Sequence, residues 1–345
     1  MTVLEREIHE QPEALARLIQ HSRPLAEDLA ARVVAFQPTS VVIAARGSSD
    51  NAARYAQYLF GAHNRLVVAL ATPSLFTLYQ SPPSLAGKLV IGISQSGRSP
   101  DIVAVIAEAR RQGALTLALT NAVESPLAQV AEHVFPLHAR EERAIAATKT
   151  YTAQLVALAM LSAALEGEPA RWKALETVPE MVQRTIDANT QVHDLVSRFR
   201  YAGHFAVIGR GFNYATAFEI ALKMKETSYV IAEPYSSADF LHGPIAMIDE
   251  GFPVVAIAPS GKVLADVTSL IEVLEERRAE LIVISDRQEL LDRARAPLAL
   301  PTGVPEWLSP VTAVIPGQLW AHALAVTRGL DPDRPRGLRK VTETL

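Results

Sequence analysis

Apolar residues along this chain follow two patterns that alternate from one terminus to the other. Short runs rich in Val, Ile, Leu and Ala predict buried strands, and longer stretches with apolar residues three or four positions apart predict amphipathic helices. Because the strand-like runs are apolar at nearly every position, they are typical of a parallel sheet covered by helices on both faces, in an α/β fold. The predicted strands lie at 40–45, 89–93, 115–119, 205–208, 254–258 and 281–284.

A long helical segment is predicted at the start of the chain, over residues 4–36. Leu15 and Ile19 are four residues apart there and share one helical face. Pro24 is expected to divide the segment into two helices, because proline has no amide hydrogen for an internal helical position. Further helices are predicted at 51–59, 101–111 and 171–199.

Two sequence landmarks recur at one spacing. The Arg-Gly pairs at 46–47 and 210–211 are 164 residues apart, and so are the Ser-Gly pairs at 96–97 and 260–261. A shared offset between independent landmarks indicates an internal duplication, although a coincidence would give the same pattern. A chain of 345 residues is also long enough for two domains.

The predicted organisation follows from the duplication and from local breaks. Gly167, Glu168 and Pro169 interrupt a long helical stretch, and the last residues, DPDRPRGLRKVTETL, are too polar to form a core of their own. The predicted parts are an N-terminal helical segment (1–38), a first, phosphate-binding domain (39–168), a connecting helix (169–198), a second domain (199–330) and a tail (331–345).

Composition excludes several classes of function. The chain has no cysteine, which rules out disulfides, thiolate metal sites and a cysteine nucleophile. Its net charge of −4 and the lack of a long basic run argue against nucleic acid as a partner. The charged N-terminus is not a signal peptide, and no apolar stretch is long enough to span a membrane. We expect a soluble, cytoplasmic protein with no membrane partner, no cofactor and no metal.

The run Ser-Gln-Ser-Gly-Arg-Ser at 94–99 is the strongest local candidate for a ligand site. It follows a predicted parallel strand, and Ser99 with Pro100 suits the start of a helix, whose positive end attracts phosphate. Gly97 lets the backbone approach a ligand closely. An ordinary Ser/Gly turn before a capped helix remains the alternative. The second domain keeps only a Pro-Ser-Gly sequence at 259–261, so one phosphate site per chain is expected.

Together with two further segments, this run resembles the sugar isomerase (SIS) domain family. The loop 94–99 is similar to the family's phosphate loop. Residues 221–249 are similar to the catalytic segment of the isomerase half of glucosamine-6-phosphate synthase, and 331–345 to its carboxyl terminus. The resemblance covers about 40–345 and implies two tandem doubly wound SIS domains, each a flavodoxin-like three-layer α/β/α sandwich.

The resemblance also implies roles for individual residues. Glu226 corresponds to the glutamate that moves a proton between sugar carbons 1 and 2, with Lys223 one turn earlier on the same helix. His242 corresponds to the histidine of ring opening, and Lys340 to the lysine that forms an imine with the ketose. The implied phosphate and substrate ligands are Ser48, Ser49, Ser94, Gln95, Ser96, Gly97, Ser99 and Ala147.

Each catalytic assignment has a structural alternative. Lys223 and Glu226 are three residues apart and could be a surface ion pair. His242 could make only structural hydrogen bonds, and Lys340 could be a solvated tail residue. An imine requires an unprotonated lysine, so we expect Lys340 to be desolvated or close to another cation such as Lys223.

The implied activity is an isomerising deaminase that converts glucosamine 6-phosphate to fructose 6-phosphate and ammonia, in a homodimer whose His242 reaches the neighbouring subunit's site. Provided that this chain is the whole protein, the absence of a glutaminase domain and of any cysteine excludes glutamine-dependent transfer. The sequence departs from the synthase at two places. Ala147 stands where the synthase has a serine, and Val341 follows Lys340 directly, where the synthase has one more residue between the lysine and the valine. The alternatives are deamination or deglycation of another amino-sugar or sugar-amine phosphate, ammonia-dependent glucosamine 6-phosphate formation, or a non-catalytic regulatory module.

Overall fold

The computed structural model describes residues 1–340 as two compact units. The first-sheet unit contains residues 13–142, 149–176, 339 and 340. The second-sheet unit contains residues 1–12, 143–148 and 177–338. Each unit has its own five-stranded sheet, in which all neighbouring strands are parallel. The predicted α/β class with two parallel-sheet domains is therefore confirmed.

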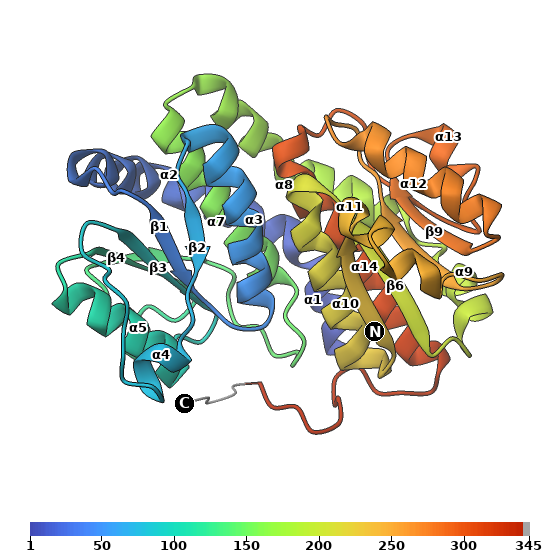
Figure 1. Cartoon of the computed structure of the whole chain (residues 1–345), viewed down its shortest axis with the longest axis horizontal. Coiled ribbons are helices and arrows are strands. Elements are labelled where there is room, and N and C mark those ends of the chain that lie inside the picture. The colour runs from blue at the N-terminus through green and yellow to red at the C-terminus, as the bar shows by residue number, and fades with distance from the viewer. Residues whose placement is uncertain (341–345) are drawn as a thin grey trace. The chain divides into compact units, whose positions relative to one another are not determined.

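The first sheet has the strand order β2-β1-β3-β4-β5. Helices lie on both sides of it (Figure 1). Val90 and Ala118 belong to the apolar cluster that α5 and α6 cover, while α3 packs against α7. The strands are β1 (Val41–Ala44), β2 (Val68–Leu70), β3 (Leu89–Ser94), β4 (Leu115–Thr120) and β5 (His133–Pro136).

The second sheet repeats the arrangement of the first. Its order is β10-β9-β8-β6-β7, which is the same path through the sheet when the strands are counted from β6. Corresponding strands of the two sheets begin 163 to 165 residues apart, which confirms the duplication that the offset of 164 indicated. The strands are β6 (His204–Gly209), β7 (Ile231–Ser236), β8 (Pro253–Ile257), β9 (Glu280–Ser285) and β10 (Ala296–Ala299).

Helices connect successive strands and cover the sheets. None of those in the described residues is long and apolar enough to cross a membrane. The α-helices are α1 (Val3–His9), α2 (Gln11–Phe36), α3 (Ser48–Asn64), α4 (Ser74–Thr77), α5 (Pro100–Arg111), α6 (Pro126–Val130), α7 (Lys149–Glu166), α8 (Pro169–Ala188), α9 (Val192–Val196), α10 (Tyr214–Ser228), α11 (Ser237–Leu241), α12 (Leu264–Glu276), α13 (Gln288–Leu291) and α14 (Ser309–Thr327). Short 3-10 helices are η1 (Ser197–Phe199), η2 (Gly211–Asn213), η3 (Pro244–Met247) and η4 (Glu306–Leu308).

Two helix predictions are wrong in their boundaries. Pro24 lies inside α2, and the first segment instead breaks at Glu10. Leu18 and Leu29 are buried on either side of Pro24, so packing offsets the hydrogen bond that the proline removes. The helix predicted over 171–199 ends at Ala188, where the Asn189 side chain donates to the carbonyl oxygen of Ala299 at 2.8 Å.

Helices α10 and α14 pack unusually closely in the second-sheet unit. Gly317 of α14 faces Ile220 of α10, and a Cβ atom at Gly317 would lie 2.3 Å from an Ile220 side-chain carbon. Ile220 is fully buried and β-branched, so it has little freedom to move aside. Glycine at this position therefore sets the separation of the two helices.

We predict that Gly317→Ala lowers the free energy of unfolding by about 1–3 kcal/mol, through overpacking. Gly61→Ala on α3 is the matched control, because its new methyl group would meet only the carbonyl oxygen of Leu66 at 3.9 Å. That control should be neutral or stabilising by up to about 1 kcal/mol, since alanine favours helix. Urea denaturation of both variants tests the packing, and equal effects would contradict it.

Candidate functional site

The strand order of the first sheet reverses between β1 and β3. These two strands are neighbours, and the chain runs outward from them to opposite edges of the sheet. Open α/β sheets bind ligands in the crevice at such a point. Ser48 and Ser49 follow β1, and the loop 94–99 follows β3, so the fold brings both predicted phosphate-binding segments to one edge of one sheet.

The loop 94–99 is held in shape by its own hydroxyls. Ser94 Oγ accepts a hydrogen bond from the Gly97 amide at 3.1 Å, and Ser96 Oγ accepts one from the Arg98 amide at 3.4 Å. Gly97 has φ +62°, and a Cβ atom there would lie 2.0 Å from Ser125 Oγ. Glycine is therefore required by both conformation and space, and the loop is more tightly specified than an ordinary turn.

Helix α5 begins where the sequence predicted. Ser99 is its N-cap and Pro100 its first residue, but the Ser99 hydroxyl makes no capping hydrogen bond. The Ser99 hydroxyl therefore lies at the positive end of the helix without capping it. Asp101, fully buried in the first turn, accepts from the Ile102 amide at 2.9 Å and from Arg46 Nε at 2.8 Å. Arg46 thus places a half-exposed guanidinium beside the loop, a site feature that the sequence analysis missed.

The two serines after β1 differ in their environments. Ser49 is buried in the first turn of α3, and its Oγ accepts from Gln154 Nε2 of α7 at 2.9 Å. Ser48 is half-buried. Ser49 can still donate its hydroxyl hydrogen to an anion, and Gln154 orients that hydroxyl.

The tail residue Lys340 has a specific partner in the same unit. Its Nζ lies 3.0 Å from Oε2 of Glu142, whose side chain is fully buried. Glu142 also accepts from the amide and the hydroxyl of Thr150, at 3.1 and 2.7 Å. Lys340 is therefore not a freely solvated residue, because it pairs with a buried carboxylate. Val341 lies outside the described residues.

Helix α10 in the second-sheet unit carries a buried ionic cluster. Lys223 is 2% exposed, and its Nζ lies 2.5 Å from Oε2 of Glu226 and 3.5 Å from Oε1 of Glu219. The Glu219 side chain is fully buried, whereas that of Glu226 is 23% exposed. The alternative of a surface ion pair is therefore wrong: a buried lysine holds one buried and one accessible carboxylate.

His242 lies at the end of α11 and is exposed. Its Nδ1 is 2.7 Å from the carbonyl oxygen of Ala238, and a carbonyl can only accept, so Nδ1 carries the hydrogen. The second nitrogen, Nε2, then has its lone pair available to accept a proton. Ala147, in the segment before α7, is half-buried and has no polar side-chain atom that could hydrogen-bond to a ligand.

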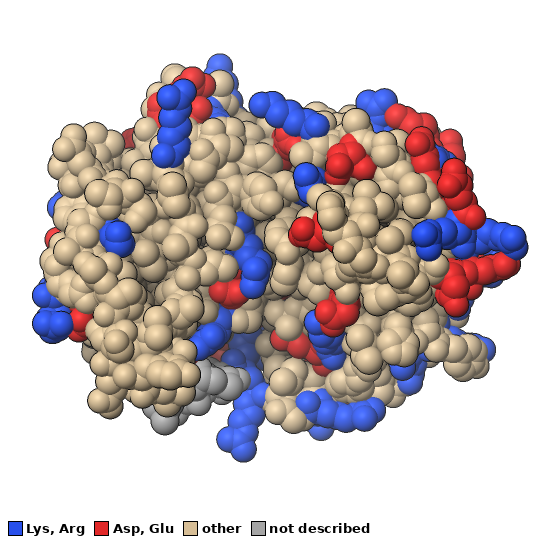
Figure 2. Space-filling view, viewed as in Figure 1, with Lys and Arg blue, Asp and Glu red and all other residues tan. Residues whose placement is uncertain are grey.

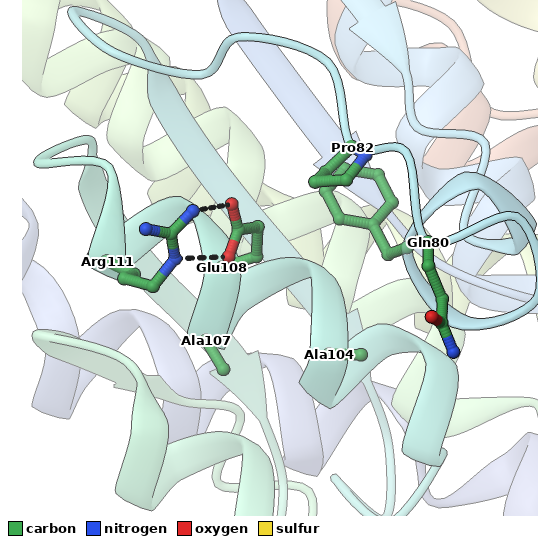
Figure 3. Close-up of a pocket in the computed structure, with 7 residues that line it drawn as sticks. Gln80, Pro82, Ala104, Ala107, Glu108 and Arg111 are labelled. Atoms are coloured by element: carbon green, nitrogen blue, oxygen red, sulfur yellow. Dashed lines mark hydrogen bonds and ion pairs between the residues drawn. The ribbon is translucent and has the colours of Figure 1, made fainter.

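A groove of about 410 Å³ in the first-sheet unit lies apart from the predicted phosphate-binding segments (Figure 3). It lies along α5 toward its carboxyl end, away from the loop 94–99. Its cation, Arg111, makes two hydrogen bonds of 2.7 Å to Glu108. Hydrogen bonds from Arg111 and Gln112 lower the pKa of Glu108 to about 2. Its lining residues are Phe76, Gln80, Pro82, Ala104, Ala107, Glu108 and Arg111.

Charges of both signs are paired on the surface of the second-sheet unit. Figure 2 shows acidic and basic side chains mixed together around α12 in the second-sheet unit. Arg293 pairs with Glu275 there, and Arg198 pairs with Glu280 at 2.7 Å.

Comparison with known proteins gives a consistent result across the chain. The SIS domain model matches residues 36–164 and 198–328. A glutamine–fructose-6-phosphate aminotransferase (isomerizing) from Thermococcus kodakarensis is 38% identical over 345 residues, which cover 97% of this chain and 57% of that protein. The chain thus spans little more than half the length of that curated relative.

Solved structures share the fold over nearly the whole chain. A crystal structure from Silicibacter pomeroyi DSS-3, provisionally described as a phosphosugar isomerase, has a TM-score of 0.88 and 34% identity, covering 96% of this chain and 100% of that one. The C-terminal domain of glucosamine-fructose-6-phosphate aminotransferase from Francisella tularensis also has a TM-score of 0.88, with 28% identity, covering 97% of this chain and 98% of that one.

We predict that Lys223→Met destabilises the protein by about 3–5 kcal/mol, because it leaves two carboxylates on α10 without their shared cation. Lys225→Met on the same helix is the control. Lys225 is exposed and lies 3.4 Å from the exposed Glu233, a type of pair worth no more than about 1 kcal/mol. Denaturant unfolding of the two variants measures the difference. Similar decreases in the free energy of unfolding would show that pairing of buried charges does not stabilise the cluster.

Proposed function

Since this chain belongs to the SIS domain family, we propose that it is a sugar-phosphate enzyme that converts glucosamine 6-phosphate to fructose 6-phosphate and ammonia. The observation that carries the proposal is the ionic cluster of α10. Lys223 and Glu219 are buried, and Lys223 fixes the carboxylate of Glu226 while leaving it accessible. A fixed, accessible carboxylate is what proton transfer between adjacent carbons requires.

The loop 94–99 is assigned to the phosphate group of the substrate. Ser99 offers an unused hydroxyl at the start of α5, and the Gly97 backbone lies at a point that no larger residue could occupy. Arg46 adds a guanidinium whose charge Asp101 partly balances. Helix N-terminus, hydroxyls and guanidinium together suit a phosphate monoester, which is anchored while the sugar carbons react.

The proton transfer is assigned to Glu226. His242 Nε2 accepts the proton of the C1 hydroxyl and passes it to the ring oxygen as the bond between C1 and the ring oxygen breaks. Glu226 then removes the C2 hydrogen of the open-chain amino aldose as a proton and returns it to C1, while the proton that the amine loses is transferred to the C1 oxygen. The C1 aldehyde becomes a hydroxymethyl group, and the amine at C2 becomes an imine. No oxidant or reductant is consumed, because the aldehyde is reduced as C2 is oxidised within one molecule.

Release of ammonia is assigned to Lys340. Its free amine attacks C2, a bond forms from Nζ to C2, and the substrate nitrogen leaves as ammonia. Water then hydrolyses the lysine imine to give the ketose and to restore the amine. Lys340 must separate from Glu142 before it attacks, since the ion pair engages its ammonium form.

The same groups can act in the opposite direction, from fructose 6-phosphate and ammonia. Ala147 gives the sugar no hydroxyl partner where the synthase has a serine, so the substrate panel includes galactosamine 6-phosphate and phosphorylated sugar-amine adducts. His242 is exposed, which supports a homodimer in which it acts on the sugar bound by a neighbouring subunit. Tight binding of every sugar phosphate without turnover would instead identify a regulatory module.

We predict that Glu226→Gln reduces turnover of glucosamine 6-phosphate at least 100-fold, the usual loss for a general base. Glu233→Gln removes an exposed carboxylate from β7 and should leave turnover unchanged. The assay follows ammonia and fructose 6-phosphate released by the purified protein. Wild-type inactivity on the whole panel, or full activity of the Glu226→Gln variant, would refute the proposed reaction.

A further inference from the structure

Three metal-binding side chains from three separate helices meet in the second-sheet unit. Glu5 lies on α1, His193 on α9 and His322 on α14, and their candidate ligand atoms all lie within 4.8 Å of one another. The rings of the two histidines are 5.8 Å apart at their centres and perpendicular. These residues are too far apart in the sequence to form a recognisable motif, so only the fold reveals the cluster.

His322 has a buried nitrogen that the described part of the chain does not satisfy. The residue is 2% exposed, and its Nδ1 has no hydrogen-bond partner within residues 1–340. Its Nε2 lies 3.0 Å from Thr2 Oγ1, which also accepts from the Glu5 amide. If Nε2 donates to Thr2, Nδ1 presents a lone pair, and a buried lone pair without a partner costs free energy.

The other two side chains are free to turn toward His322. Glu5 is half-buried and His193 is exposed, and within residues 1–340 neither side chain makes a hydrogen bond or an ion pair. Two imidazoles and one carboxylate form a donor set that suits zinc and its neighbours rather than magnesium or calcium.

We propose that Glu5, His193 and His322 bind one divalent transition-metal ion of the zinc class, separate from the sugar-phosphate site. A tetrahedral zinc ion with bonds of about 2.1 Å needs ligand atoms about 3.4 Å apart, so the side chains must close by about 1.4 Å at most. Rotation of Glu5 and His193 can supply that movement. Thr2 then holds the second nitrogen of His322, as the outer partner of a metal-bound histidine does.

The ion would fasten the first helix of the chain to the second-sheet unit. Asp333 already holds α1 there, accepting hydrogen bonds from the amides of Val3 and Leu4 at 2.7 and 2.9 Å. The metal adds a second attachment through Glu5, the residue that follows Leu4 in α1. Its three protein ligands leave a fourth position for water on the exposed side, where His193 lies.

The test is zinc binding by the untagged full-length protein after treatment with a chelator. We expect one zinc ion per chain in a competition titration with a chromophoric chelator, and an increase in Tm on adding zinc. Cobalt substitution should give the intense visible bands of a four- or five-coordinate site. His193→Gln, at an exposed position, should weaken zinc binding at least tenfold and abolish the increase in Tm.

His204→Gln is the matched control, since His204 is also exposed in the second-sheet unit but lies outside the cluster. It should bind zinc as the wild type does. Failure of the wild type to bind zinc stoichiometrically, or equal binding by the His193→Gln variant, would overturn the site. Neither result depends on sugar-phosphate turnover, so the site and the proposed reaction stand or fall separately.

Discussion

All ten described strands run parallel within their sheets, and this constraint governs the rest of the molecule. Parallel neighbours cannot be joined by a tight turn, so each connection needs a crossover that covers a face of the sheet. Every strand therefore delivers its following loop to the same edge. The order reverses between β1 and β3, and that edge is where Ser48, Ser49 and the loop 94–99 are placed. The candidate phosphate site follows from topology together with a few local hydroxyls.

Buried ion pairs fix the side chains to which the proposed chemistry is assigned, which the strand order alone does not do. Lys223 satisfies Glu219 and Glu226 on α10, and Glu142 holds Lys340 in the first-sheet unit. Burying a charge is costly unless it is paired, so these clusters point to function more than to stability. Glu226 and Lys340 are the more accessible partners in their clusters, and they are also the residues to which the proposed chemistry assigns proton and amine transfer.

The sequence predicted the central strands and missed the edges. Every missed strand (β2, β5, β7 and β10) lies at the edge of its sheet, where one side is open and the sequence need not be uniformly apolar. Within β7, the alternating exposure of Ile231, Ala232 and Glu233 hides the strand from a search for apolar runs. The break predicted at Pro24 was wrong because burial along α2 outweighs the free-energy cost of a proline inside the helix.

The parts of the site formed by residues adjacent in the sequence were predictable, whereas the parts formed by residues that only the fold brings together were not. The run 94–99 carries its own signature in hydroxyls, glycine and a following proline. The partners Glu219 and Glu142 carry no such signature, because only their burial sets them apart from most other glutamates of the chain. The same holds for Glu5, His193 and His322, which no spacing in the sequence brings together.

Reductive trapping tests the central claim most directly. Incubating the protein with fructose 6-phosphate and borohydride would convert an imine at C2 into a stable secondary amine, which peptide mass mapping can locate. The account predicts one modified residue, Lys340, and no modification in the Lys340→Met variant. A label on Lys223 or Lys149, or no label at all, would contradict the assignment of the tail lysine to the site.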